Sequence, residues 1–354
     1  MTYHIEAGRR RLLGSGQTAM EIFFVLSGFV ITRSLLLEAG RIRLGRFYAR
    51  RALRLTPALV VFMAVALMMI RIWRGAIPSN LLWMAGGALF YSSNIVLVRL
   101  RGGVEVFGGL WSLSIEEQFY LVWPLVLRSL TKGSRTRTYV LVAGAACLSL
   151  LSRVLRLSAG PTDNWYAYGT DPRALGLLLG CLGGLMSVWG VPWISKQPRV
   201  LLDLAAAAAT AYLVGSALLV RSYVPHTFVT WWFGAPVASL VLITVLAHQT
   251  RTTASSVFGC RLLVGLGRIS YSLYLWHFLV LSVLEPWVGG PRHLGEPTRY
   301  LALAALSIAI ARLSYVVIER PFVRIGRTIG RGQEGSSTDE APVVAAPDAG
   351  ASHR

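Results

Sequence analysis

Stretches of apolar residues long enough to cross a lipid bilayer recur along most of this chain. A helix needs about 20 mainly apolar residues to span the hydrocarbon core. Hydrophobic residues make up 54% of the chain and charged residues only 14%, whereas a typical soluble domain is roughly 25% charged. The pattern therefore predicts an all-α, polytopic bundle of transmembrane helices and disfavours a soluble fold. The stretches lie near residues 18–38, 55–73, 81–99, 109–129, 138–156, 173–190, 200–220, 230–248, 269–288 and 299–318.

Basic residues gather in the connections between these stretches. The formal net charge is +19, and arginine carries almost all of it. Short basic loops lie on the cytoplasmic side of inserted proteins, so this distribution indicates contact with a lipid bilayer rather than with nucleic acid. The basic segments share the cytoplasmic side only if stretch 81–99, with Ser92, Ser93 and Asn94 at its centre, is re-entrant or lies at the surface. About nine or ten spans are then expected, and with nine the N-terminus would lie outside.

The chain is expected to form one transmembrane domain over residues 1–325. Residues 326–354 are rich in Gly, Ser, Ala, Pro and acidic residues and lack the apolar side chains that would offset chain entropy. They are predicted to be a disordered cytoplasmic tail. The cysteines and histidines lack metal-ligand spacing, so no metal site is expected. The chain also lacks a GxSxG elbow and a Walker loop, which disfavours the serine-hydrolase and nucleoside-triphosphatase classes.

An arginine-rich segment follows the first apolar stretch. At 100° per residue, Arg50 and Arg54 share one face of a helix over residues 41–54, while apolar residues share another. The pattern predicts an interfacial helix, with Pro57 opening the next span. One interpretation is an anchor for anionic lipids. The other is a phosphate clamp for a cytosolic cofactor such as coenzyme A, formed by Arg50, Arg51 and Arg54, because arginine forks match phosphate oxygens.

Two consecutive acids, Glu116 and Glu117, lie at the head of an aromatic-rich stretch. Neighbouring helical residues point about 100° apart, so only one of the two is expected to face a given cavity. An acid inside the membrane costs about 2.5–3.5 kcal/mol, which favours a functional role for one that faces inward. An interfacial pair in contact with water is the alternative.

Small residues recur every four positions in the stretch that starts near Arg173. Gly176, Gly180 and Gly184 form this repeat, which predicts close contact with another helix. Arg173 precedes the repeat by three residues. It is a candidate to line a polar site, and a charge at the membrane interface is the alternative.

Five motifs occur in order between residues 23 and 322. They are FFVLSGF at 23–29, FYARRALRLTP at 47–57, LWSLSIEEQFYLVWP at 110–124, GRISYSLYLWH at 267–277 and IERPF at 318–322. Each is weak alone, but the ordered set resembles the membrane acyltransferase 3 family of bacterial O-acyltransferases. In the family pattern, a helix with an arginine and a terminal histidine precedes a short loop and an acid. His4 and Glu21 match the histidine and the acid, but most of that helix lacks a counterpart, so a truncated start is expected.

The resemblance implies a multi-pass enzyme of the bacterial plasma membrane. The expected reaction transfers an acyl group, with acetyl the expected one, from acyl-CoA (acetyl-CoA) to a hydroxyl of a carbohydrate or of a glycosylated natural product. Acyl-CoA is a co-substrate, and no bound cofactor is expected. His4 is implied as the general base, with Glu21 orienting it. Substrate positioning is assigned to Glu116, Glu117 and Arg173.

A transporter or flippase of a polar metabolite is the alternative from another class. It would also need charges inside the membrane and glycine-mediated helix contacts. Inverted repeats would favour it, and none is visible between the two halves of the sequence.

Overall fold

Helices form all the regular structure in the residues that the structure describes. The computed structural model describes residues 2–38, 43–100, 106–158, 165–190, 196–219, 225–248, 253–284 and 296–328. Within these ranges, the side chains of residues 2–15, 157, 219, 225–232, 248, 283–284, 296–297 and 327 lie outside that description. No strand occurs in these ranges. Six helices are long and apolar enough to cross a membrane, judged by length and composition. The predicted all-α, multi-pass membrane bundle is confirmed.

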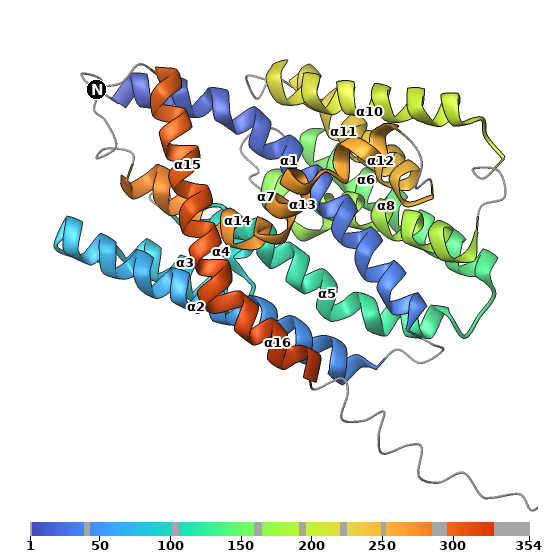
Figure 1. Cartoon of the computed structure of the whole chain (residues 1–354), viewed down its shortest axis with the longest axis horizontal. Coiled ribbons are helices and arrows are strands. Elements are labelled where there is room, and N and C mark those ends of the chain that lie inside the picture. The colour runs from blue at the N-terminus through green and yellow to red at the C-terminus, as the bar shows by residue number, and fades with distance from the viewer. Residues whose placement is uncertain are drawn as a thin grey trace, which may run out of the picture.

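The helices follow one another along the chain as shown in Figure 1. They are α1 (Thr2–Leu37), α2 (Leu44–Arg74), α3 (Ser79–Leu89), α4 (Ser93–Arg99), α5 (Leu110–Leu130), α6 (Arg135–Ser158), α7 (Trp165–Tyr168), α8 (Thr170–Trp189), α10 (Arg199–Leu219), α11 (Pro225–His248), α12 (Thr253–Phe258), α13 (Arg261–Arg268), α14 (Ser270–Leu279), η1 (Val280–Leu284), α15 (Glu296–Ser314), η2 (Tyr315–Glu319) and α16 (Arg320–Thr328). The segments η1 and η2 are π-helical and continue the helices before them.

The stretch 81–99 does not form one spanning helix. It is divided between α3, of 11 residues, and α4, of 7 residues. Tyr91, in the turn between them, has a left-handed backbone with φ 50°. Each piece is shorter than the roughly 20 residues that cross a bilayer. This geometry agrees with the re-entrant interpretation of this stretch.

Three expected boundaries differ from the structure. Pro57 does not open a span, because it lies inside α2, which begins at Leu44 and continues to Arg74. A proline inside a membrane helix is tolerated where neighbouring groups satisfy the freed carbonyl. The first helix begins at Thr2 rather than near residue 18, so the expected loop ahead of Glu21 is absent from α1. At the other end, α16 continues to Thr328, beyond the expected start of the tail at 326; residues 329–354 lie outside the described residues.

The glycine repeat packs α8 directly against α1, as predicted. A Cβ atom at Gly180 would lie 2.0 Å from the carbonyl oxygen of Val25, and one at Gly184 would lie 2.8 Å from that of Phe29. Gly28 on α1 is equally restricted, since its Cβ would lie 1.9 Å from the oxygen of Leu177. Only glycine allows the two backbones to approach this closely.

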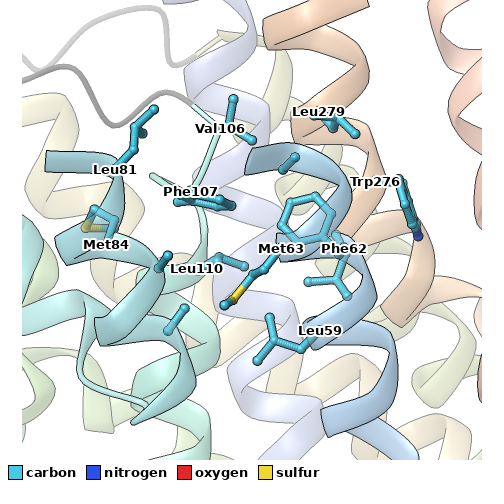
Figure 2. Close-up of a cluster of buried hydrophobic side chains, with 14 of the residues drawn as sticks. Leu59, Phe62, Met63, Leu81, Met84, Val106, Phe107, Leu110, Trp276 and Leu279 are labelled. Atoms are coloured by element: carbon cyan, nitrogen blue, oxygen red, sulfur yellow. The ribbon is translucent and has the colours of Figure 1, made fainter. Parts of the chain in front are cut away.

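A cluster of buried apolar side chains joins helices that are distant in sequence. Figure 2 shows side chains of α2, α3, α14 and the start of α5 meeting in it. The Phe62 ring lies at its centre, edge-on to Phe107 at 6.0 Å and to Trp276 at 5.6 Å between ring centroids. Edge-on aromatic pairs add about 0.5–1.5 kcal/mol beyond their area burial. This cluster holds α14 and the pair α3–α4 against α2.

Substituting Gly180 by Ala is expected to destabilise the bundle, because the new methyl group collides with the Val25 carbonyl. Overpacking of this kind costs about 1–3 kcal/mol. Gly144→Ala in α6 is the matched control, because a Cβ there meets no atom within 4 Å. The stability of both variants is measured as the midpoint of thermal unfolding in detergent. A Gly180→Ala protein as stable as the control would contradict the close packing of α1 and α8.

Candidate functional site

A fully buried carboxylate, that of Glu21, lies on α1 where this helix packs against α8. Its Oε1 atom accepts hydrogen bonds from two guanidinium groups. The Nη2 atom of Arg153, on α6, is 3.0 Å away, and the Nη1 atom of Arg173, on α8, is 2.9 Å away. Both arginine side chains are buried. The three charges therefore join three helices at one oxygen atom.

Main-chain carbonyls fix both guanidinium groups in place. The Nε atom of Arg173 donates to the oxygen of Ala167 at 2.7 Å, and the Nε atom of Arg153 donates to the oxygen of Pro172. Both carbonyls belong to the corner formed by α7 and the start of α8. The guanidinium of Arg173 also lies 5.0 Å from the ring centroid of Trp111, a cation–π distance.

Gly176 allows α8 to lie against the carboxylate. A Cβ atom at this position would lie 3.0 Å from the Cβ atom of Phe24 and 3.2 Å from Oε2 of Glu21. It follows Arg173 by three residues on the same helix, so both residues face α1. The same repeat that packs the two helices thus brings the arginine to the acid.

Asp171 clamps the corner next to this cluster. Its carboxylate accepts hydrogen bonds from the hydroxyl of Ser152 and, at 2.6 Å, from the indole nitrogen of Trp165. Arg156 lies 3.5 Å from its Oδ2 atom in a half-exposed pair. These contacts tie the end of α6 to α7 and α8, where the two buried arginines are held.

A second charged cluster joins α2, α5 and α1. The Nε atom of Arg51 lies 2.9 Å from each carboxylate oxygen of Glu117, and its Nη2 atom lies 3.5 Å from Oε1 of Glu116. The hydroxyl of Ser27 donates to the same Glu116 oxygen at 2.6 Å. The guanidinium also lies 3.3 Å from the ring centroid of Tyr120.

Both acids of the Glu116–Glu117 pair face inward, so the expectation that only one would do so is wrong. Arg51 lies between them and reaches both, because a guanidinium is wide enough to contact neighbours on adjacent positions of a helix. The side chain of Arg51 is only 20% exposed. Arg51 therefore does not share the surroundings of Arg50 and Arg54, the other two arginines of the predicted phosphate clamp. Arg54 is exposed, and the half-buried Arg50 donates to the carbonyl of Gly326 at 3.3 Å.

The two clusters lie at different depths in the bundle. Glu21 and Ser27 are six residues apart on α1, which is about 9 Å along the helix axis. On α5, Trp111 contacts the first cluster and Glu117 belongs to the second. The Glu21 cluster lies toward the start of α8, whereas the Arg51 cluster lies toward the start of α2.

A neutral network links α4, α5 and α8 beside these clusters. Gln118 donates to the carbonyl of Tyr91 at 2.7 Å and to the side-chain oxygen of Asn94 at 3.0 Å. The amide of Asn94 donates in turn to Thr170 at 3.1 Å, and the hydroxyl of Thr170 donates to Gln118 at 2.7 Å. These bonds hold the turn between α3 and α4 against the rest of the bundle.

The structure does not bring His4 and Glu21 together. Both lie on α1, and 17 residues of helix separate them by about 25 Å. The side chain of His4 lies outside the described residues. In contrast, the predicted residues Glu21 and Arg173 form a direct ion pair.

Arg153 is the site residue that sequence reasoning missed. The signal was present, because an arginine inside an apolar stretch is costly and marks a functional position by default. Trp111 was missed because it belongs to a motif rich in aromatic residues. Within the described residues, no group of three or more His, Cys, Asp or Glu side chains is placed to hold a metal ion.

Comparisons with known proteins agree with the motif pattern. A family model described as an acyltransferase domain matches residues 2–316. The chain is 29% identical to the peptidoglycan O-acetyltransferase OatA of Listeria monocytogenes and 31% identical to the O-acetyltransferase OatA of Staphylococcus aureus. These matches cover 88% and 92% of this chain but 52% and 55% of the relatives, so the chain spans about half of their length. No solved structure matches the chain.

Replacing Glu21 by Gln is expected to lower stability strongly, because it leaves two buried guanidinium groups without an anion. Breaking a buried pair in this way costs about 3–5 kcal/mol. Arg156→Ala is the control, since an exposed pair contributes about 0–1 kcal/mol. The midpoint of thermal unfolding is compared for both variants in the same detergent, and equal losses of stability would show that burial does not strengthen the contribution of Glu21.

Proposed function

This chain belongs to the acyltransferase 3 family, and on that basis we propose that it is an integral-membrane O-acetyltransferase. The proposed donor is acetyl-CoA, and the proposed acceptor is a hydroxyl of a glycan, with peptidoglycan suggested by the names of the relatives. The observation that carries this proposal is the buried Glu21 cluster. Ionised groups at this depth in a membrane bundle are costly and mark functional positions.

The donor is proposed to meet the arginine-rich start of α2. Arg54 is exposed and Arg50 is half-buried there, so both are placed to contact phosphate groups of coenzyme A. Arg51 is proposed to act differently, because Glu117 already holds it in a two-oxygen pair. With Glu116 and Glu117, it would shape the path inward from the phosphate contacts.

The proposed reaction is an ordinary acyl transfer. The acceptor oxygen attacks the carbonyl carbon of the thioester, a C–O bond forms, and the C–S bond breaks. The hydroxyl proton passes to a base, and coenzyme A leaves as a thiolate that takes up a proton. The base must lie within hydrogen-bond reach of the hydroxyl.

The role of His4 as this base depends on the shape of α1. Along an unbroken helix, His4 and Glu21 cannot reach one hydroxyl, since about 25 Å separates them. Gly14 and Gly16 lie between them, and each glycine weakens a helix by about 1 kcal/mol relative to alanine. We propose that α1 breaks at this point during transfer, which would let the two residues approach.

The proposed activity is tested with radiolabelled acetyl-CoA in membranes that contain the protein and peptidoglycan fragments. Label is expected in the glycan as an acetyl ester, which mild base hydrolyses to release labelled acetate. Label that crosses the membrane and accumulates without modification would instead support the transporter alternative.

Replacing Arg54 by Ala is expected to raise the KM for acetyl-CoA by about 3- to 10-fold with little change in kcat, because a phosphate contact of about 1 kcal/mol is lost. Arg128→Ala is the control, since Arg128 is an exposed cation at the end of α5. Equal effects of both variants would indicate a general surface charge effect.

His4→Ala is expected to abolish transfer while the protein still accumulates in the membrane, because a positioned base contributes roughly 10²–10⁴-fold. Gly16→Ala should also slow transfer if α1 must break, although a Cβ atom there meets nothing within 4 Å and stability should not fall. Turnover rates in membranes, normalised to protein amount, measure both. Normal turnover in His4→Ala would remove the base assignment, and normal turnover in Gly16→Ala would remove the break.

A further inference from the structure

Arg153 has a position that helix packing alone does not require. It lies inside an apolar span, its side chain is fully buried, and it reaches Glu21 at 3.0 Å across 132 residues of sequence. An apolar residue at such a place is often as stabilising as a buried ion pair, or more so. A second guanidinium on a carboxylate that Arg173 already contacts therefore points to a role beyond stability.

The two arginines bind the same oxygen of Glu21 and leave the other one without a hydrogen-bond donor. Both hydrogen bonds end on Oε1. The Oε2 atom is buried, and no donor in the described part of the chain reaches it. A buried carboxylate oxygen without a donor is unfavourable, and each such oxygen can accept two hydrogen bonds. Oε2 is thus oriented as an acceptor for a group that these residues do not supply.

The carboxylate is held rigidly in this orientation. Arg153 and Arg173 each use Nε to bind a carbonyl of the corner between α7 and α8, and they use the other end of the guanidinium to bind Oε1. A lysine ammonium lacks this planar fork. Gln17, one turn before Glu21 and half-buried, accepts from Arg173 at 3.0 Å, so polar groups continue from the carboxylate toward the end of the bundle.

We propose that Arg153 is a positioning residue for the acceptor. Together with Arg173, it fixes Oε1 of Glu21, so that Oε2 accepts a hydrogen bond from the hydroxyl that will be acylated. The ligand class is a carbohydrate hydroxyl, which offers the donor that Oε2 lacks. This inference rests on the proposed function, because it assigns the acceptor side of the same site. Arg153 acts through Glu21 and does not touch the acceptor.

The test compares Arg153→Gln, Arg153→Lys and Arg153→Met, with Arg137→Gln, a change of an exposed arginine on the same helix, as the control. The steady-state rates use acetyl-CoA and soluble peptidoglycan oligosaccharides. Arg153→Gln is expected to lower kcat/KM for the oligosaccharide at least 30-fold and to leave the KM for acetyl-CoA within about twofold. Arg153→Lys is expected to recover only a small part of the loss. Arg137→Gln should stay within about twofold of the unmodified chain.

Arg153→Met separates positioning from stability. It leaves Glu21 paired with Arg173, so the cluster keeps one cation and one anion, and an apolar side chain can replace a buried charge without loss of stability. Its thermal midpoint should therefore stay at or above that of Arg153→Gln, whereas its turnover should stay low, because a single arginine then holds Oε1. Recovery of turnover in Arg153→Met would overturn the proposal, as would normal acceptor kinetics in a folded Arg153→Gln protein.

Direct binding keeps this test distinct from that of the proposed function. The same oligosaccharide is titrated into each purified variant without acetyl-CoA, and binding is followed by tryptophan fluorescence. The unmodified chain is expected to bind it at least tenfold more tightly than Arg153→Gln. Binding of this kind without any acetyl transfer would reject the proposed reaction and retain the acceptor site. Equal affinities, or no binding by the unmodified chain, would reject the acceptor site.

Discussion

The contact between α1 and α8 is the constraint on which the rest of the site depends. Gly28, Gly180 and Gly184 bring the two backbones so close that a single Cβ atom would collide with a carbonyl or a side chain. In a membrane, where no hydrophobic effect draws helices together, such packing is a main source of association. Its consequence is electrostatic: it places Arg173 against Glu21 in a medium where neither charge would be stable alone.

Two charged clusters each include a residue of α1 but differ in their geometry. Around Glu21, two arginines converge on one oxygen and leave the other without a donor. Around Arg51, two glutamates surround one guanidinium, and Glu117 engages it with both oxygens. The first arrangement leaves one buried carboxylate oxygen without a donor, whereas in the second each carboxylate accepts a hydrogen bond. Helix α5 contacts both clusters, through Trp111 at the first and Glu117 at the second.

Sequence reasoning identified several parts of this site for sound physical reasons. The spacing of Gly176, Gly180 and Gly184 predicted a close contact, because residues four apart share one face of a helix. The family resemblance identified Glu21 as a candidate. The cost of charge in a membrane drew attention to Glu116 and Glu117, and the same rule would have identified Arg153. What could not be predicted was the pairing of these residues, since neither periodicity nor motif order specifies which distant helices meet. The inward orientation of both acids at 116 and 117 likewise depends on one wide guanidinium from another helix.

The sequence by itself determined the class of the protein: long apolar stretches with basic connections require helices in a bilayer, and the ordered motifs place the chain in its family. Those properties follow from the composition of short segments and from the order of motifs along the chain, so they can be recognised without knowledge of the fold. Only the tertiary structure decided that Glu21 lies with two arginines and that Arg51 lies with two glutamates. It also decided that one helix carries both His4 and Glu21. The reason is that ion pairs between helices depend on their relative depth and rotation, which packing sets and local sequence does not encode.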